Sequence, residues 1–223
     1  DAAGEGLLKV PVACITDIDV MPDCAPVIVG KREPFPALKD RRWRKKSDFA
    51  AGELDARREA IRAKASGQFV ETFVSDGWTL EYDLALHGLA EEVWVAATLA
   101  QQDEKINEPG KPENIANVTE AAEAEFREMQ ETYGNAEELA SHVYSLFTKS
   151  PKASKSIAAQ YLSEILEGKV KCGTYNAESL AKRLPPYVTG ALRYATGNDE
   201  DEAENGNGEG ATTPNTEVTG GPA

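Results

Sequence analysis

The chain has 223 residues, of which 41% are hydrophobic and 28% are charged, and its formal net charge at pH 7 is −14. This length allows one substantial core and favours one domain or two small ones. No apolar run is long enough to cross a membrane, so we expect a soluble protein without a membrane partner. Three cysteines, none at a Cys-x-x-Cys spacing, argue against a disulfide framework or a structural zinc site and favour a cytoplasmic setting.

The negative charge is unevenly distributed. Residues 197–223 hold seven acidic residues and no basic one, and without them 24 basic and 31 acidic residues remain, a net of −7. In contrast, six of the eight residues in 39–46 are basic: Lys39, Arg41, Arg42, Arg44, Lys45 and Lys46. Salt screens charges beyond roughly 10 Å, so a local basic segment can bind phosphates on an acidic protein. The acidity therefore does not exclude DNA as a partner.

The first part of the chain predicts two strands separated by an insertion. Leu7 to Ile15 is almost continuously apolar, which is typical of a strand buried on both faces of a parallel sheet. Residues 31–67 form a basic insertion with a helix from Ser47 to Ala65, for which Ser47 is the expected N-cap. A second strand is expected from Gln68 to Val74, and Ser75 to Gly77 should end it and supply a helix cap.

The remainder is expected to be mostly helical. The spacing of apolar residues predicts helices over Trp78–Gln102, Val118–Tyr133, Ala136–Thr148, Lys155–Leu166 and Ala177–Ala195. Gly168 should stop the fourth helix, and Pro185-Pro186 should kink or split the last. The organisation is therefore an α/β unit over 1–168 that includes a helical segment at 112–150, then a helical extension over 169–196 and a disordered acidic tail over 197–223.

Two aspartates mark the end of the first predicted strand. Asp17 and Asp19 follow its apolar run, and ligands of open α/β sheets lie outside the carboxyl ends of the strands. In an extended segment, side chains two residues apart point the same way, and paired carboxylates favour a hard cation such as Mg²⁺ or Mn²⁺. The alternative is a turn or a helix cap at the strand end.

Glu81 and Lys155 complete the candidate site. Glu81 lies in the first turn of the helix after the second strand, where a carboxylate also complements the helix dipole. If the two strands are neighbours, Glu81 emerges at the same sheet end as the two aspartates. Lys155 starts a helix, where its charge opposes the dipole, which suggests an anion-binding role. The alternative for Lys155 is a solvated surface lysine.

These residues bring a family resemblance into view. The segments VACITDIDVMPD, FVSDGWTLEYDLAL and SPKASKSIAAQYL closely resemble, in this order, the C-terminal region of OLD (overcoming lysogenization defect) nucleases. That region has a TOPRIM fold, which implies a Rossmann-like parallel sheet here. The resemblance covers Leu7 to about Leu166, and TLEYDLA is its most family-specific piece. It implies a DNA endonuclease of phage defence.

The resemblance also implies roles for individual residues. Asp17 and Asp19 match metal ligands, Glu81 a further ligand near a second metal, and Lys155 the catalytic lysine, with Lys152 as the nearby alternative. The supporting residues of the site would be Thr79, Asp23 and Asp83. The basic residues of 39–46 would face DNA, although a solvated basic turn is an equally good interpretation of their composition.

The chain departs from the family pattern in two respects. It has no strand followed by Glu-Gly-x-x-Glu, and it has no GxxxxGK[S/T] phosphate-binding loop. Both features would precede Asp1 in the family, so we expect the chain to start inside the C-terminal region. ATP would then act only through a separate N-terminal ABC-type ATPase domain, and a homodimer is the expected assembly if there is one.

The expected reaction is phosphodiester hydrolysis at two divalent cations roughly 4 Å apart, with Lys155 offsetting charge on the phosphate. One alternative is a non-catalytic TOPRIM module that binds DNA or assembles a complex. A phosphatase of the haloacid dehalogenase type also places Asp-x-Asp after a strand, but the chain lacks its later Gly-Asp-x-x-x-Asp pair outside the tail. A primase or topoisomerase fragment fits less well, because TLEYDLA is not their pattern.

Overall fold

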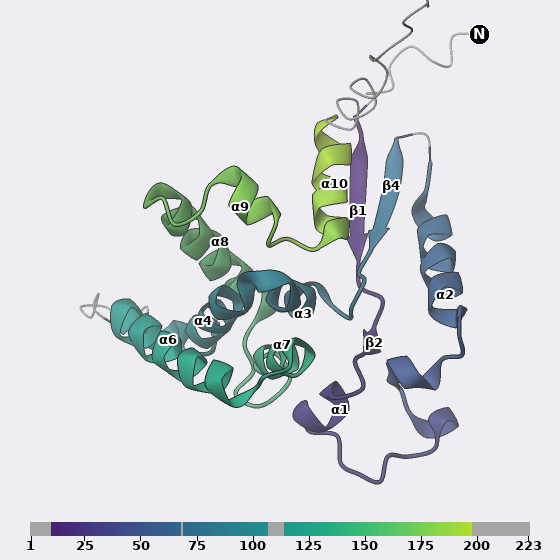
Figure 1. The fold of residues 1–223 in the computed structure, drawn as a ribbon, viewed down its shortest axis with the longest axis horizontal. Coiled ribbons are helices and arrows are strands. Elements are labelled where there is room, and N and C mark those ends of the chain that lie inside the picture. Colours follow the sequence, from purple (N-terminus) through teal and green to yellow (C-terminus); the bar gives the residue numbers. More distant parts are fainter. Residues whose placement is uncertain (1–9, 68, 107–113, 198–223) are drawn as a thin grey trace, which may run out of the picture.

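The computed structural model describes residues 10–67, 69–106 and 114–197 as a mixed α/β fold (Figure 1). Strands β1 (Val12–Thr16) and β4 (Val70–Val74) pair in parallel, with Val12 opposite Val70 and Thr16 opposite Val74. A second, very short parallel pair joins β2 (Val20–Met21) to β3 (Arg44–Lys45). The described helices are α1 (Ala25–Ile28), α2 (Glu53–Arg62), α3 (Leu80–Leu84), α4 (Ala90–Gln101), α5 (Asp103–Ile106), α6 (Asn114–Thr132), α7 (Ala136–Ser145), α8 (Lys155–Lys171), α9 (Ala177–Ala181) and α10 (Pro186–Thr196).

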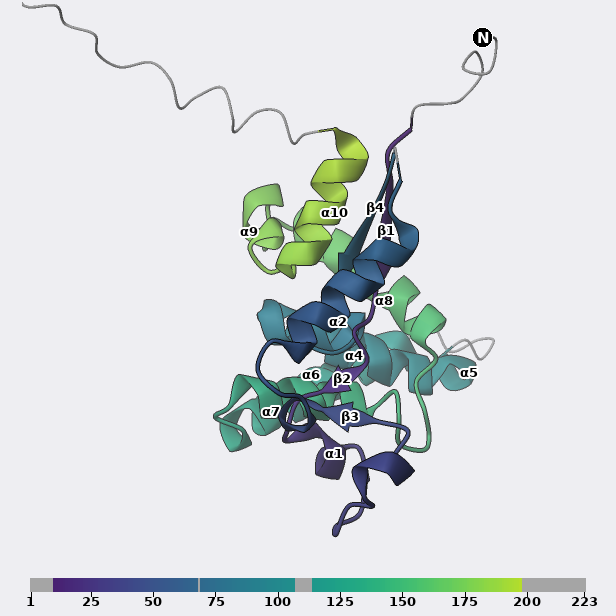
Figure 2. The ribbon, with the colours of Figure 1, turned by 90° about the vertical axis from the view of Figure 1, so that its right-hand side faces the viewer.

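Helices α2 and α10 cover opposite faces of the β1–β4 sheet (Figures 1 and 2). Val74 is fully buried in a small apolar cluster that includes Leu54 of α2. Its neighbour Phe73 lies against α10, where its ring centroid is 6.0 Å from that of Tyr194. Successive residues of a strand point to opposite faces, so these two contacts place one helix on each side. The α10 segment, expected as a C-terminal extension, is therefore part of the sheet packing.

Strand β1 is shorter and more exposed than the sequence predicts. It begins at Val12, immediately after Pro11, which has no N–H to contribute to the ladder. Residues 7–9 of the predicted strand lie outside the described residues. The expectation of burial on both faces is wrong, because Val12 and Ile15 are 47% and 44% exposed. Within the described residues β1 pairs with β4 alone, so it is an edge strand with incomplete cover.

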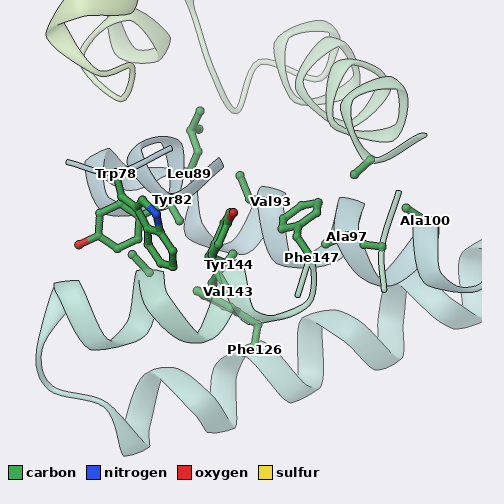
Figure 3. Close-up of a cluster of buried hydrophobic side chains, with 14 of the residues drawn as sticks. Trp78, Tyr82, Leu89, Val93, Ala97, Ala100, Phe126, Val143, Tyr144 and Phe147 are labelled. Carbon is green, nitrogen blue, oxygen red and sulfur yellow. The ribbon is translucent and has the colours of Figure 1, made fainter. Parts of the chain in front are cut away.

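The principal core lies among the helices, beside the sheet. Helix α4 is buried on several sides because it packs against α6, α7 and α8. Figure 3 shows the aromatic part of this core, in which Tyr144 lies between Trp78 and Tyr82 on one side and Phe147 on the other. The α4 residue Val93 lies beside Tyr144 and Phe147. Full burial of an apolar or aromatic side chain contributes roughly 1.5–3 kcal/mol, so this cluster is a major source of stability.

The helix predicted from Ser47 to Ala65 starts later than expected. Helix α2 begins at Glu53, and the residue before it, Gly52, has a left-handed φ of 82° that ends the preceding turn. Ser47 belongs to a short 3-10 turn, Lys46–Asp48, and both its N–H and its hydroxyl donate to Asp23. The N-cap prediction for Ser47 is therefore wrong, because a distant carboxylate takes its hydrogen bonds.

The predicted helix from Trp78 to Gln102 forms as two α-helices joined by a π-helical turn. It begins at Leu80, where Thr79 is the N-cap and accepts a 3.4 Å hydrogen bond from the Tyr82 N–H. The cap is thus Thr79, and the expectation that Ser75 to Gly77 supplies it is wrong. The π turn spans Ala85–Leu89 and contains Gly88 at φ 118°, a conformation that glycine adopts without steric cost.

The C-terminal helices correct one prediction and confirm another. Helix α8 continues through Gly168 to Lys171, so the predicted stop is wrong and the expected domain boundary at 168 falls inside a helix. The αL residue that follows the helix end is Gly173, at φ 80°. Pro185-Pro186 separates α9 from α10, as predicted. Of the expected acidic tail, 198–223 lie outside the described residues. No helix in the described ranges is long and apolar enough to span a membrane.

Candidate functional site

The two aspartates of the candidate site lie in the loop that follows β1. Asp17 is half-buried, and its Oδ1 accepts a 3.0 Å hydrogen bond from the backbone N–H of Leu80 at the start of α3. Asp19 is exposed, and its own N–H donates to the carbonyl of Trp78 at 3.3 Å. Asp19 has a φ of 56°, so the segment is not extended through both residues. The loop is instead fixed by one side-chain hydrogen bond, to Leu80, and one backbone hydrogen bond, to Trp78, at the start of α3.

Glu81 and Lys155 meet although 74 residues separate them in the sequence. The Nζ of Lys155, the first residue of α8, lies 2.8 Å from Oε2 of Glu81 in the first turn of α3. The Glu81 side chain is 19% exposed and that of Lys155 is 48% exposed. The ion pair therefore lies at the surface, and Glu81 is the more buried of the two partners. Together with the hydrogen bond between Asp17 and Leu80, this ion pair brings together candidate residues from three separate segments of the chain.

The electrostatics of the site couple Asp17 to its neighbours. Burial raises the pKa of Asp17; the Leu80 N–H and Lys155 oppose this, while the charges of Glu81 and Asp19 add to it. Burial alone would lower the pKa of Lys155, but the hydrogen bond and charge of Glu81, helped by Tyr144 and Asp17, raise it instead. Lys155 is therefore held as a cation, beside an aspartate whose ionisation is disfavoured.

Tyr144 is the site residue that sequence reasoning missed. It comes from α7, and the Lys155 ammonium lies 5.4 Å from its ring centroid, which is a cation–π contact. The ring is 8% exposed and packs against Trp78 with centroids 4.2 Å apart (Figure 3). In the sequence Tyr144 is one more member of an amphipathic helix, so no local signal distinguishes it. Its position indicates that it limits the freedom of the lysine side chain.

The expected supporting residues organise loops. Thr79 is 2% exposed and caps α3. Asp83 is 1% exposed and accepts hydrogen bonds from the Ser75 hydroxyl at 2.5 Å and the Trp78 N–H at 3.2 Å, so it shapes the loop before α3. Asp23 is paired with the basic segment, 3.1 Å from Nζ of Lys45. Asp83 thus contributes to the site through the loop that it holds, whereas the contacts of Asp23 are with the basic segment.

Lys152, the alternative to Lys155, has no part in the cluster. It is exposed, and it makes no hydrogen bond or ion pair with the described residues. The geometry therefore distinguishes the two lysines that the sequence left as alternatives: Lys155 contacts the acidic cluster and Lys152 does not.

Four of the six basic residues in 39–46 make internal contacts. Arg41 pairs with Asp48 at 2.7 Å and its side chain is 8% exposed, while Lys45 pairs with Asp23. Lys46 pairs with Glu137 of α7 at 2.7 Å, and the Arg44 guanidinium lies 5.9 Å from the ring of Phe49. The two that remain exposed without such a contact in the described chain are Lys39 and Arg42. The segment is thus a folded element as well as a basic one.

The donor chemistry of the acidic cluster suits a hard divalent cation. Carboxylate oxygens are the ligands that Mg²⁺ and Mn²⁺ prefer, and the charges of Glu81 and Asp19 raise the pKa of Asp17, a repulsion that a cation would relieve. Among the described residues, however, no group of three or more His, Cys, Asp or Glu side chains is arranged closely enough to hold a metal ion. In this arrangement the Glu81 carboxylate is paired with the Lys155 ammonium.

Comparison of the chain with protein families, curated proteins and solved structures gives no match, so the likeness to OLD nucleases rests on the three sequence segments alone.

Proposed function

We propose that the protein is a Mg²⁺- or Mn²⁺-dependent DNA endonuclease of the OLD type, with a TOPRIM-like α/β core. The observation that carries the proposal is the convergence of Asp17, Glu81 and Lys155 at the carboxyl ends of β1 and β4. These residues come from three segments far apart in the chain. A turn or a cap would account for each carboxylate alone, but neither accounts for a cationic lysine drawn into the same cluster.

Each residue then has a distinct task. Asp17, Asp19 and Glu81 would hold the cations, and two such ions would supply an activated water and stabilise the leaving oxygen. Lys155 would stabilise the charge that develops on the phosphate, and Tyr144 would keep its ammonium over the site. Glu81 holds Lys155 in place, and it would also be a metal ligand. In the proposed function, DNA is the substrate, the setting is cytoplasmic, and an ABC-type ATPase domain and a second copy of the chain are partners.

The first prediction concerns cleavage of supercoiled plasmid. With Mg²⁺ or Mn²⁺ the protein should nick the plasmid, and Asp19→Ala should abolish the reaction. Lys155→Ala should slow it by about 10²–10³-fold, the usual cost of losing one transition-state charge contact. Gel electrophoresis of timed samples measures the rate. Lys152→Ala is the matched control, because this exposed lysine lies three residues away and outside the cluster. Undiminished cleavage by both site variants would overturn the assignment.

A second candidate function is a non-catalytic TOPRIM-like module that binds DNA or assembles a larger complex. The observation that favours it is the geometry of the carboxylates: the described residues contain no preformed three-ligand metal group, and Glu81 is paired with Lys155. In that function the Glu81–Lys155 pair would be a structural tie between α3 and α8.

Metal binding discriminates the two functions. If the site is real, Mn²⁺ should raise the melting temperature of the protein, and Asp17→Asn should remove the shift. The shift should weaken as the pH is lowered, because a ligand must be deprotonated and burial raises the pKa of Asp17 above its ordinary value of 3.8. Differential scanning fluorimetry with Mn²⁺ at several pH values measures both effects. An equal shift in the wild type and in Asp17→Asn would favour the non-catalytic module.

A further inference from the structure

Helix α2 lies beside β4 and packs on the loop that carries the two aspartates of the candidate site (Figure 1). The residue between these aspartates, Ile18, is 1% exposed and belongs to an apolar cluster against which Leu54 and Ile61 of α2 pack. The carbonyl oxygen of Ile18 accepts a 3.2 Å hydrogen bond from Nε of Arg57 in the same helix. Helix α2, which is part of the predicted insertion, therefore borders the candidate site.

Arg57 differs from the other two arginines of α2 in its partners. Arg58 pairs with Asp55 at 2.8 Å. Arg62 pairs with Glu59 at 2.6 Å. Arg57 is exposed, and it makes no ion pair with the described residues. Its positive charge is therefore directed to the aspartate loop without being neutralised by a carboxylate of the described chain.

The remaining donors of Arg57 form a planar fork. A guanidinium has five N–H donors, and the one on Nε is used by Ile18. The four on Nη1 and Nη2 have no partner among the described residues. One N–H from each of these two nitrogens matches two oxygens of a phosphate group. Asp19, the residue after Ile18, is also exposed and without an ion pair in the described ranges, so a cation and an anion could bind side by side here.

We propose that Arg57 binds a phosphate group of the DNA substrate beside the candidate site, with Nη1 and Nη2 donating to two phosphate oxygens. The contact rests on the proposed nuclease function, which makes DNA the ligand. Asp17, Asp19 and Glu81 would repel a phosphate if no cation were bound, so we expect the contact in the metal-bound protein. Arg57 would then hold the strand from α2, while Lys155 acts from α8.

The alternative is that Arg57 only ties α2 to the aspartate loop. Two substitutions separate the tie from the charge. The amide nitrogen of glutamine lies as many bonds from Cα as Nε of arginine does, so Arg57→Gln keeps a donor for the Ile18 carbonyl and removes the charged fork. Arg57→Lys does the reverse, because it keeps a positive charge and has no donor at the position of Nε.

Fluorescence anisotropy of a labelled DNA duplex in a salt series measures the contact, with Ca²⁺ in place of Mg²⁺ to limit cleavage. We expect Arg57→Gln to weaken binding about tenfold, the usual cost of losing hydrogen bonds to a charged group. The slope of log affinity against log salt should become shallower by about 1, because one phosphate contact is lost. Arg57→Lys should keep the wild-type slope. Arg62→Gln is the matched control, because it removes the same charge from the same helix, and it should bind DNA like the wild type.

Three outcomes would overturn the proposal. Wild-type affinity and slope in Arg57→Gln would show that Arg57 is only a structural tie. An equal loss in Arg62→Gln would show that the total charge of α2 decides binding. A wild type that binds no DNA would leave no phosphate for Arg57 to contact. If instead the wild type binds DNA and Arg57→Gln weakens it as expected, but no plasmid is nicked, the phosphate contact stands and the proposed nuclease function fails.

Discussion

Gly77 is the residue at which the loop before α3 has no room for a side chain. A Cβ placed there would lie 2.1 Å from Oδ1 of Asp83, far inside van der Waals contact. Asp83 cannot move away easily, because it is 1% exposed and its two oxygens accept hydrogen bonds from Ser75, Gly77 and Trp78. This small network sets the position of Trp78 and the start of α3, and hence of Glu81.

We therefore predict that Gly77→Ala lowers the free energy of unfolding by roughly 3 kcal/mol. The added methyl group overpacks the loop and breaks hydrogen bonds to a buried carboxylate. Urea denaturation followed by tryptophan fluorescence measures the change. Gly134→Ala is the matched control, because a Cβ at Gly134 would meet no atom within 4 Å. Equal stability of the two variants would show that Asp83 does not constrain this loop.

Helices α4 and α8 are held together by a partly buried ion pair in addition to apolar packing. Glu92 of α4 is 2% exposed, and its carboxylate lies 2.7 Å from Nζ of Lys169 and accepts a hydrogen bond from the Tyr175 hydroxyl. Burial alone would raise the pKa of Glu92, but Lys169 and Tyr175 lower it below its ordinary value of 4.5. A lowered pKa means that the folded protein favours the charged carboxylate.

This pair predicts a pH dependence of stability. Because the pKa of Glu92 is lower in the folded state, its contribution is fully present above about pH 4.5 and is lost as the pH falls through the folded value. Glu92→Gln should cost about 1–3 kcal/mol at pH 7 and should flatten the acid side of the stability profile. Chemical denaturation between pH 3 and pH 7 measures both. Glu178→Gln, in the exposed Glu178–Lys182 pair, should leave the profile unchanged. If the free energy of unfolding falls by the same amount between pH 7 and pH 3 in the wild type and in Glu92→Gln, this role is contradicted.

At the scale of the whole molecule, the basic residues of 39–46 fall into two groups that composition alone does not distinguish. Arg41 is structural: it pairs with Asp48, lies 4.5 Å from the ring of Trp43 and is almost buried. Lys39 and Arg42 project from the same segment and are exposed. If DNA binds here, Lys39 and Arg42 supply the phosphate contacts, and Arg41 stabilises the folded conformation of the segment.

The two groups predict opposite responses to mutation. Lys39→Ala combined with Arg42→Ala should leave the unfolding free energy unchanged but weaken DNA binding. The slope of log affinity against log salt should become shallower by about 2, because two phosphate contacts are lost. Arg41→Ala should instead lower the unfolding free energy by about 1–3 kcal/mol, because it leaves Asp48 short of a partner. Fluorescence anisotropy in a salt series and urea denaturation measure these effects. An unchanged salt slope would remove this segment from the DNA interface.

Local chemistry accounts for the parts of the fold that the sequence predicted well. Hydrophobic spacing predicted the two parallel strands and the helices after Trp78. The missing N–H of proline predicted the split at Pro185-Pro186. Predictions failed where a distant residue decided the outcome. Ser47 bonds to Asp23 instead of capping a helix, and α8 runs through Gly168 while Lys169 pairs with Glu92.

The candidate site, too, could be predicted from the sequence only in part. The sequence by itself determined which residue types were available at the strand ends, because Asp17 and Asp19 follow the apolar run of β1 and Glu81 follows that of β4. Only the tertiary structure decided that Lys155 rather than Lys152 joins them and that Tyr144 lies beneath its ammonium. These contacts join helices that are far apart in the chain. Their geometry depends on how α3, α7 and α8 pack around α4, which no local pattern encodes.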